Sequence, residues 1–438
     1  MQLKDRWNLD TTVSDQDSLT RYEHLLDGYV TFASDLAPDR LQAALAEDPA
    51  PMAQVLYGHF MTSAHTAEAN GAAQATLSAL KVRLPDLNPR EKAHVAALDA
   101  AVQGHVEVTN DIWCDIVSAW PTDMAALRLS HFGLFNRGDL GRMESVARVA
   151  ANAWSDDLPR RSYLGGTLAF ALEELGRYEE AEAHGRAAVD VDEHDLWSIH
   201  AVAHTLEMRQ RVDDGLEWFA GRGDVLDSHG SFAGHLWWHH ALYLIEAGQF
   251  DEALALHDRG VFPEPSTEGL TLTNSIALLS RLEFAGADIG TRWHALLEPM
   301  RFRIGVHSHP FNDCHFVLGA CLADDVDLAV LLVDGMTEWA TTAPGSATQV
   351  LNDGGLNTAR GLLAFGQGNT QEAERLLAAG LSDRWRLGGS HAQRDVFEQA
   401  RIASAERGGD TALAHRLLEA RIAKKPGSPA TQRWLSRV

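Results

Sequence analysis

The amino-acid sequence predicts an all-α fold, a right-handed superhelix of stacked helical hairpins of the tetratricopeptide-like kind. Alternating β-branched runs with Asn-Gly turns between them are nearly absent, so we do not expect strands as main elements. Helix-start signals recur along the chain, and a turn pattern repeats at about the spacing of a tetratricopeptide repeat. Together these observations favour helical hairpins that stack on one another.

The repeat lies in the middle of the chain. Segments that begin at Gly176, Gln210 and Gly248 align, and their starts are 34 and 38 residues apart (210 − 176 and 248 − 210). A tetratricopeptide repeat has ~34 residues. Each segment is interpreted as the turn inside a hairpin, with a small residue where its two helices touch: Ala181, Gly215 and Ala253. Fainter copies of the turn occur near residues 368 and 408.

Helices are predicted along the whole chain, in order. The first follows a sequence like a capping box at residues 14–17 and extends to about Ser34. Asn88 gives a stronger start signal, because Pro89 occupies the first helical position and Glu91 the third. Further early helices are expected over residues 51–64, 72–84, 106–119, 124–136 and 140–154. The first helices of later hairpins are expected over residues 163–175, 196–209, 232–247, 270–284, 311–322, 347–365 and 391–405.

These elements predict two regions. Residues 1–160 form less regular helical hairpins, and residues 161–438 form tetratricopeptide-like repeats that continue the first part as one superhelix. In such repeats the first helix of each hairpin lines the concave side, and the polar clusters of this sequence fall on those first helices. Acidic pairs elsewhere, such as Glu173-Glu174, are expected on solvated surfaces.

Composition excludes several functional classes. The net charge of −24 argues against nucleic acid as a partner, because phosphate binding requires a basic surface. No apolar run approaches the ~18 residues of a membrane span, and the first residues lack the apolar core of a signal peptide. Cys114, Cys314 and Cys321 are too few and too far apart for a disulfide framework, so they are expected to be packed thiols. The sequence therefore predicts a soluble cytoplasmic protein.

The strongest candidate site is a set of histidines on two first helices. His200 and His204 lie four residues apart, which places both imidazoles on one helical face, and Glu207 joins that face. His235 and His239 repeat the spacing on the next first helix. Because such a face normally carries Leu and Ile, imidazoles there need either polar partners or a task.

Three interpretations of this set stay open. The pair His200 and His204 has a true zinc spacing, and Glu207 completes a candidate ligand set. However, Ala201 stands where zinc proteases of the His-Glu-x-x-His type carry Glu. The other two interpretations are histidines hydrogen-bonded to neighbouring helices, and a metal-free pocket for acid–base chemistry or ligand binding.

Several stretches resemble the tetratricopeptide repeat protein 38 family. They are residues 5–8, 200–207, 235–242, 311–315 and 388–397, and the run Gly-Gly-Ser-His-Ala-Gln-Arg-Asp within the last is the most specific. The whole 438-residue length fits this resemblance. It implies the helical-repeat fold and the positions of site residues, and it gives Asp313 and His315 more weight as functional residues. It implies no particular reaction.

The remaining candidates lie on later first helices. Asp313 and His315 are two residues apart and so face apart, and His307 and His309 just before them resemble a short metal motif. His391, Arg394 and Asp395 share one face: either they form a local structural pair, or Asp395 orients His391 while Arg394 clamps a carboxylate.

Trp237 and Trp238, beside His235 and His239, are interpreted as core packing or as the wall of a ligand pocket. His240 points about 100° away from His239 and is expected to contact a second helix.

The leading hypothesis is a closed superhelix around a pocket for a small anionic ligand. Catalytic roles are assigned to His200, His204, His239, His315, His391 and Asp395, which would make the protein an enzyme using acid–base chemistry. Ligand-binding roles are assigned to Glu207, His235, Trp237, Trp238, Asp313 and Arg394. No resident cofactor is predicted, with a divalent metal at His200, His204 and Glu207 as an alternative. A peptide- or protein-binding scaffold is the other alternative, and self-association stays open.

Overall fold

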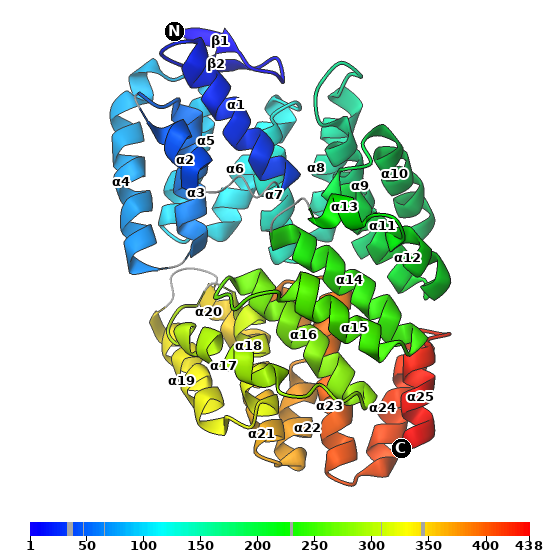
Figure 1. Cartoon of the computed structure of the whole chain (residues 1–438). Coiled ribbons are helices and arrows are strands. Elements are labelled where there is room, and N and C mark those ends of the chain that lie inside the picture. The colour runs from blue at the N-terminus through cyan, green and yellow to red at the C-terminus, as the bar shows by residue number, and fades with distance from the viewer. Residues whose placement is uncertain (33–37, 47, 65, 228–230, 308, 343–346) are drawn as a thin grey trace. The chain divides into compact units, whose positions relative to one another are not determined.

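The computed structural model describes residues 1–32, 38–46, 48–64, 66–227, 231–307, 309–342 and 347–438. These residues divide into two compact units (Figure 1), the first ending at Val202 and the second beginning at Ala203. The boundary falls inside helix α11 (Leu196–Met208). Both units consist of helical hairpins, which confirms the predicted all-α class.

The first unit opens with a short antiparallel hairpin, β1 (Gln2–Lys4) and β2 (Asp10–Thr12), in which Leu3 faces Thr11. Helices follow in the order α1 (Gln16–Thr31), α2 (Pro38–Leu45), α3 (Pro51–Ala64), α4 (Ala67–Arg83), the 3₁₀ turn Leu84–Asp86, α5 (Pro89–Val102), α6 (Val106–Ala119), α7 (Met124–Asn136), α8 (Leu140–Ala153), α9 (Arg161–Glu174) and α10 (Tyr178–Val191). Consecutive helices from α5 to α10 pack on one another. The sequence boundary predicted at residue 160 falls between α8 and α9, inside this unit.

Capping residues explain where these helices begin. Asn88 caps α5 with a complete capping box, in which its side chain accepts from the Glu91 amide and the Glu91 side chain accepts from the Asn88 amide. Asp15 caps α1 by accepting from the amide of Ser18. The predicted end of this first helix at Ser34 lies outside the described residues.

The second unit contains α12 (Val212–Phe219), α13 (Gly223–Asp227), α14 (Ser231–Ala247), α15 (Phe250–Leu256), α16 (Gly269–Ala285), α17 (Arg292–Phe302), α18 (Pro310–Leu322), α19 (Val326–Thr342), α20 (Ala347–Val350), α21 (Leu356–Gly366), α22 (Thr370–Ala379), α23 (His391–Arg407), α24 (Thr411–Lys424) and α25 (Pro429–Arg437). Two single π-helical turns, His257–Val261 and Leu351–Gly355, and a 3₁₀ turn, Arg384–Leu387, interrupt the series. The helix predicted over residues 347–365 is therefore α20, a π-turn and α21 in succession.

The aligned repeat turns have the same backbone conformation. Gly176, Gln210 and Gly248 each end a first helix with a positive φ (74°, 56° and 80°), the left-handed region that favours glycine. The small residues predicted at the helix contacts are buried; a Cβ on Gly215 would lie 2.1 Å from the ring of Tyr243. The predicted helical hairpins are thus confirmed at the level of individual turns.

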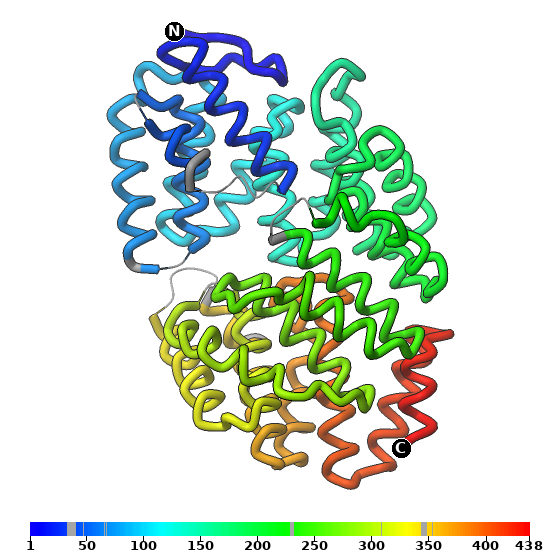
Figure 2. Tube along the Cα trace, in the orientation of Figure 1, coloured from blue at the N-terminus to red at the C-terminus, as the bar shows by residue number. Residues whose placement is uncertain are grey.

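First helices form the inner layer of the second unit. Helices α14, α16, α18, α21 and α23 pack side by side in that order, and α16 also packs on α23. Each of them packs on its own second helix, in order α15, α17, α19, α22 and α24, and Figure 2 traces the chain through these hairpins. A side chain on an inner helix therefore meets other inner helices, which is where the polar clusters come together.

One surface prediction is wrong. Glu173 and Glu174 are 0% and 4% exposed, because α9 packs between α8 and α10 and its last turn is covered. The predicted packed thiols are confirmed: Cys314 and Cys321 are buried, and burial raises their pKa, that of Cys321 to about 12.

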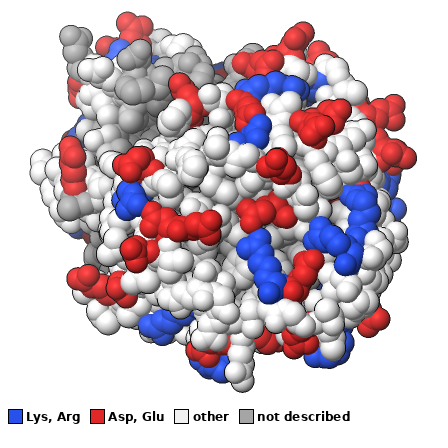
Figure 3. Space-filling model, turned by 60° about the horizontal axis from the view of Figure 1, so that its bottom comes forward, with Lys and Arg blue, Asp and Glu red and all other residues white. Residues whose placement is uncertain are grey.

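The face of the molecule in Figure 3 carries scattered acidic side chains with lysines and arginines among them, and no continuous basic area. Of the helices in the described ranges, none is long and apolar enough to cross a membrane.

Candidate functional site

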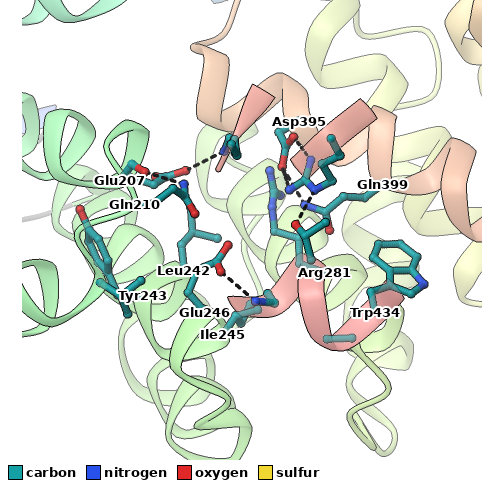
Figure 4. A pocket seen from close by; sticks show the side chains of 16 residues that line it. Glu207, Gln210, Leu242, Tyr243, Ile245, Glu246, Arg281, Asp395, Gln399 and Trp434 are labelled. Carbon is teal, nitrogen blue, oxygen red and sulfur yellow. Dashed lines mark hydrogen bonds and ion pairs between the residues drawn. The ribbon is translucent and has the colours of Figure 1, made fainter. Parts of the chain in front are cut away.

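A small cavity lies in the second unit, between inner helices and the C-terminal helices α24 and α25. Its volume is about 60 Å³, and its wall comes from α11, α14, α16, α23, α24 and α25. Figure 4 shows Glu207 on one side of it and Asp395 on the other. We call this space the Arg281 cavity, because Arg281 of α16 is its most buried charged residue, at 4% exposure. A volume this small excludes drug-sized ligands, whose pockets span roughly 300–1,000 Å³.

Charges in the lining balance formally, with Arg281, Arg421 and Lys425 against Glu207, Glu246 and Asp395, three of each sign. Most of these groups form ion pairs with one another or accept hydrogen bonds from neutral donors.

Asp395 accepts two hydrogen bonds from Arg421, one of 2.7 Å, and one of 2.8 Å from Gln399. Burial alone would raise the pKa of Asp395, but the cations Arg421, Lys425 and Arg281 hold it below its ordinary value. The prediction that Asp395 orients His391 is wrong, because the carboxylate faces α24 and is bound there by an arginine.

Glu207 and Glu246 are also held. Lys425 Nζ lies 3.8 Å from Glu207 Oε1, and His239 Nδ1 lies 3.3 Å from Glu207 Oε2. Glu246 accepts from the hydroxyl of Ser428 at 2.9 Å and from the amide of Ala430 at 3.0 Å, both at the start of α25. Neither carboxylate lies within ion-pairing distance of Arg281.

Arg281 differs from the other cations of the lining. Among the described residues its hydrogen bonds go to backbone carbonyls only: Ala277 at 2.9 Å, Ala392 at 2.7 Å and Gln393 at 3.4 Å. Its guanidinium lies 5.3 Å from the ring centre of Trp238. Burial lowers the pKa of Arg281 to about 10, even though Asp395 and Glu207 act in the opposite direction. The cavity thus contains a desolvated cation without a carboxylate bound to it.

Beside the cavity lie three of the predicted histidines. His204, His235 and His239 place one ring nitrogen each within 4.8 Å of one another. The rings of His204 and His239 are 4.4 Å apart, and those of His235 and His239 are 4.8 Å apart. We call this group the imidazole cluster; all three side chains are at least 96% buried. The sequence predicted that these three histidines face one site, and their rings do lie together.

The imidazole cluster is connected to neighbouring helices. His235 Nδ1 lies 3.0 Å from Asn274 Oδ1 of α16, and its ring stacks on Trp238 at 5.3 Å. Burial lowers the pKa of His235 to about 4 and that of His239 well below its ordinary value. These two imidazoles are therefore neutral at pH 7.

His315, on α18, is buried beside aromatic rings. Its Nδ1 lies 2.8 Å from the carbonyl oxygen of Phe311, so this nitrogen carries the proton and donates. The ring meets Phe311 at 4.4 Å and Phe397 at 4.8 Å, and its Nε2 has no hydrogen-bond partner among the described residues. Burial, helped by the charge of Arg281, lowers the pKa of His315 to about 3 despite the Phe311 contact. His315 therefore packs apart from the imidazole cluster.

Asp313 faces away from His315, as the two-residue spacing predicted. Its Oδ2 lies 3.3 Å from His307 Nδ1, and the His307 ring stacks on Trp339 at 5.1 Å. His309 Nδ1 instead lies 3.2 Å from the carbonyl of Leu387. The two loop histidines thus contact different groups, and the short metal motif does not form here.

The remaining predicted residues lie away from the cavity. His391 is exposed at the start of α23, and Arg394 donates to the carbonyl of Gly389 and lies 3.2 Å from His391 Nδ1. Trp237 packs under Arg259 at 5.6 Å rather than against a ligand space. None of the six histidines expected at one cavity lines the Arg281 cavity; His204, His235 and His239 lie together in the imidazole cluster, and His391 is exposed.

His200 belongs to the first unit, although it lies one turn before His204 on α11. Its ring stacks on Trp197 at 4.8 Å and on Phe170 at 5.3 Å. The expected second-helix contact of His240 is present, a stack on Phe219 of α12 at 5.0 Å.

Sequence reasoning missed the three cations of the cavity. Arg281 stands in an otherwise ordinary helical pattern, and Arg421 and Lys425 lie on a second helix and at its end, where solvated charges are the rule. Arg281 could have been found from its position, because it lies on a first helix, two turns after Asn274 and on the same helical face.

No protein-family model matches the chain. Among solved structures, the apo form of RapI shares 11% identity over 76% of this chain and 97% of that one, with a TM-score of 0.39. The human IFIT1 dimer with m7Gppp-AAAA shares 14% identity over 99% and 97%, with a TM-score of 0.37. Naa15/Naa10 bound to HypK-THB shares 11% identity over 94% and 64%, with a TM-score of 0.27. Similarity at this level carries no information on function.

Proposed function

We propose that this protein is a cytoplasmic member of the tetratricopeptide repeat protein 38 family whose second unit binds a small carboxylate-bearing ligand in the Arg281 cavity. The sequence motifs described above support the family assignment. The observation that carries the ligand assignment is Arg281 itself, a buried guanidinium whose hydrogen bonds go to carbonyl groups alone.

Burial of such a cation is costly unless a negative charge compensates it. Asp395 and Glu207 lower that cost at a distance, but each is bound to another cation. A carboxylate in the cavity would neutralise the charge of Arg281. Its two oxygens could accept two parallel N–H bonds from the guanidinium, the bidentate arrangement that Arg favours. The volume of about 60 Å³ restricts the ligand to a few heavy atoms.

Acid–base chemistry on this ligand would use Glu207 and His239. A carboxylate close to one ring nitrogen, here at 3.3 Å, orients an imidazole. This arrangement replaces the predicted pair of His391 and Asp395 as the place where an enzymatic role would reside. A peptide-binding scaffold is the alternative, and it would not require Arg281.

Thermal unfolding in the presence of carboxylates tests the proposal. Formate, acetate, glyoxylate and lactate are titrated, with sodium chloride at equal ionic strength as the reference. A ligand that binds only the folded state raises the melting temperature with the logarithm of its concentration above Kd. We expect at least one of these anions to do so, and its affinity to fall at least about 30-fold in Arg281→Met, the lower end for a buried charge pair.

Arg394→Met is the matched control, since this arginine binds the Gly389 carbonyl outside the cavity. Its response to carboxylates should equal that of the wild type. Arg281→Lys, which keeps the charge, guards against misfolding of the Met variant and should retain part of the response. Equal stabilisation of the wild type and Arg281→Met would refute the assignment, as would no stabilisation beyond that by chloride.

A further inference from the structure

The imidazole cluster has the composition of a metal site. Three imidazoles come from two neighbouring helices, two of them four residues apart on α14 and the third on α11. One nitrogen from each ring lies within 4.8 Å of the others. In a tetrahedral zinc site with Zn–N bonds of about 2.05 Å, ligand nitrogens lie about 3.3 Å apart. Metal binding therefore requires these nitrogens to approach one another by about 1.5 Å (4.8 − 3.3).

The groups around the rings are those that orient metal ligands. Asn274 Oδ1 faces Nδ1 of His235, and Glu207 Oε2 faces Nδ1 of His239. A histidine ligand usually donates its second ring N–H to a carbonyl or carboxylate, which fixes the ring and increases its basicity.

We infer that His204, His235 and His239 bind a divalent transition metal ion of Zn²⁺ type, with Glu207 and Asn274 as orienting groups. This ligand set differs from the predicted one in three ways: His200 is not part of it, Glu207 holds a ligand instead of being one, and α14 supplies two of the imidazoles.

The site does not depend on the carboxylate ligand. The positive charge of Arg281 acts on His239, so it also disfavours a cation there. Removing Arg281 should therefore strengthen metal binding while it removes the response to carboxylates. The two proposals can thus fail separately.

Cobalt binding to the full chain is the direct test. Protein stripped with a chelator and exchanged into metal-free buffer is titrated with Co²⁺, whose visible absorption reports tetrahedral or five-coordinate geometry, and then with Zn²⁺ in competition. We expect one equivalent per chain, at least a 100-fold loss of affinity in His239→Gln, and a 10- to 100-fold loss in Glu207→Gln. Arg281→Met should bind Co²⁺ more tightly than the wild type.

His240→Gln is the matched control, because this residue is adjacent in sequence but stacks on Phe219. It should bind Co²⁺ like the wild type. X-ray absorption of the wild-type zinc complex needs no variant and should show three imidazole nitrogens. Absence of a stoichiometric Co²⁺ complex, fewer than two imidazoles in the spectrum, or an equal loss in His240→Gln would overturn the inference.

Discussion

Replacing Asp395 by Asn removes the charge of one wall of the cavity while keeping the size of the side chain. The carboxylate receives 2.7 Å and 2.8 Å hydrogen bonds from Arg421 and Gln399, and its ion pair with Arg421 is 13% and 11% exposed on the two side chains. In the variant Arg421 keeps its charge without its counter-ion. Breaking a buried pair in this way costs about 3–5 kcal/mol. Because both side chains keep some contact with water, we expect the lower end, about 3 kcal/mol.

The assay is thermal unfolding followed by circular dichroism. For a unit of about 230 residues, 1 kcal/mol shifts the melting temperature by about 2–4 °C, so the expected decrease is about 6–12 °C. Glu372→Gln is the control, because its pair with Arg375 on α22 is exposed and contributes little. Its melting temperature should not change.

The effect of Asp395→Asn should also depend on pH. The pKa of this carboxyl is depressed in the folded state, so its stabilising contribution is present above the unfolded pKa of about 3.9 and is lost as the pH falls below it. The difference between wild type and variant should therefore be constant from pH 7 to about 5 and decrease in stronger acid. A variant that melts like the wild type at pH 7, or a difference that grows on acidification, would refute the reasoning.

Three further predictions concern other parts of the fold. Burial lowers the pKa of His59 and His131 to about 3. Each histidine should therefore reduce the free energy of unfolding by about 1.4 kcal/mol per pH unit as the pH falls from about 6.5 toward 3. A urea midpoint that is equal at pH 7 and pH 5 would contradict this. Gly215→Ala places a methyl group against the ring of Tyr243 and should cost about 1–3 kcal/mol, measured as a lower urea midpoint. Glu246→Ala removes the acceptor at the start of α25 and should make the C-terminal helix sensitive to trypsin, and unchanged cleavage would show that other contacts suffice.

Most helices were predictable because their signals are local. Residues 51–64, 106–119 and 124–136 were predicted with the bounds that α3, α6 and α7 have. The short β-hairpin was not predicted, because its three-residue strands carry no periodicity. It is held instead by the Asp5 carboxylate, which accepts from the amides of Trp7 and Leu9. The π-helical turns were also missed, because each is a single turn inside a longer helical stretch and no residue type marks it in the sequence.

The candidate site was predictable in part. Spacing of four residues placed His235 and His239 on one face, and did the same for His200 and His204 on the preceding first helix. All three members of the imidazole cluster were therefore among the predicted histidines. Residue spacing could not show that Arg394 would turn back to the Gly389 carbonyl, because that contact depends on the conformation of a glycine loop. Nor could spacing reveal the partner of Asp395, since Arg421 lies on another helix, 26 residues later.

The contacts of α25 determine when the second unit can be completed during synthesis. Ser428 and the amide of Ala430 bind Glu246 at the end of α14, and Arg433 donates to the carbonyl of Ile245. A nascent chain that has released α14 must therefore wait for about 180 more residues before this end is covered. Until then the wall contributed by Thr431 is missing and the cavity is open to water. Enclosure of the buried arginine therefore waits for α25, and a nascent chain that stops before Pro429 should bind no ligand there.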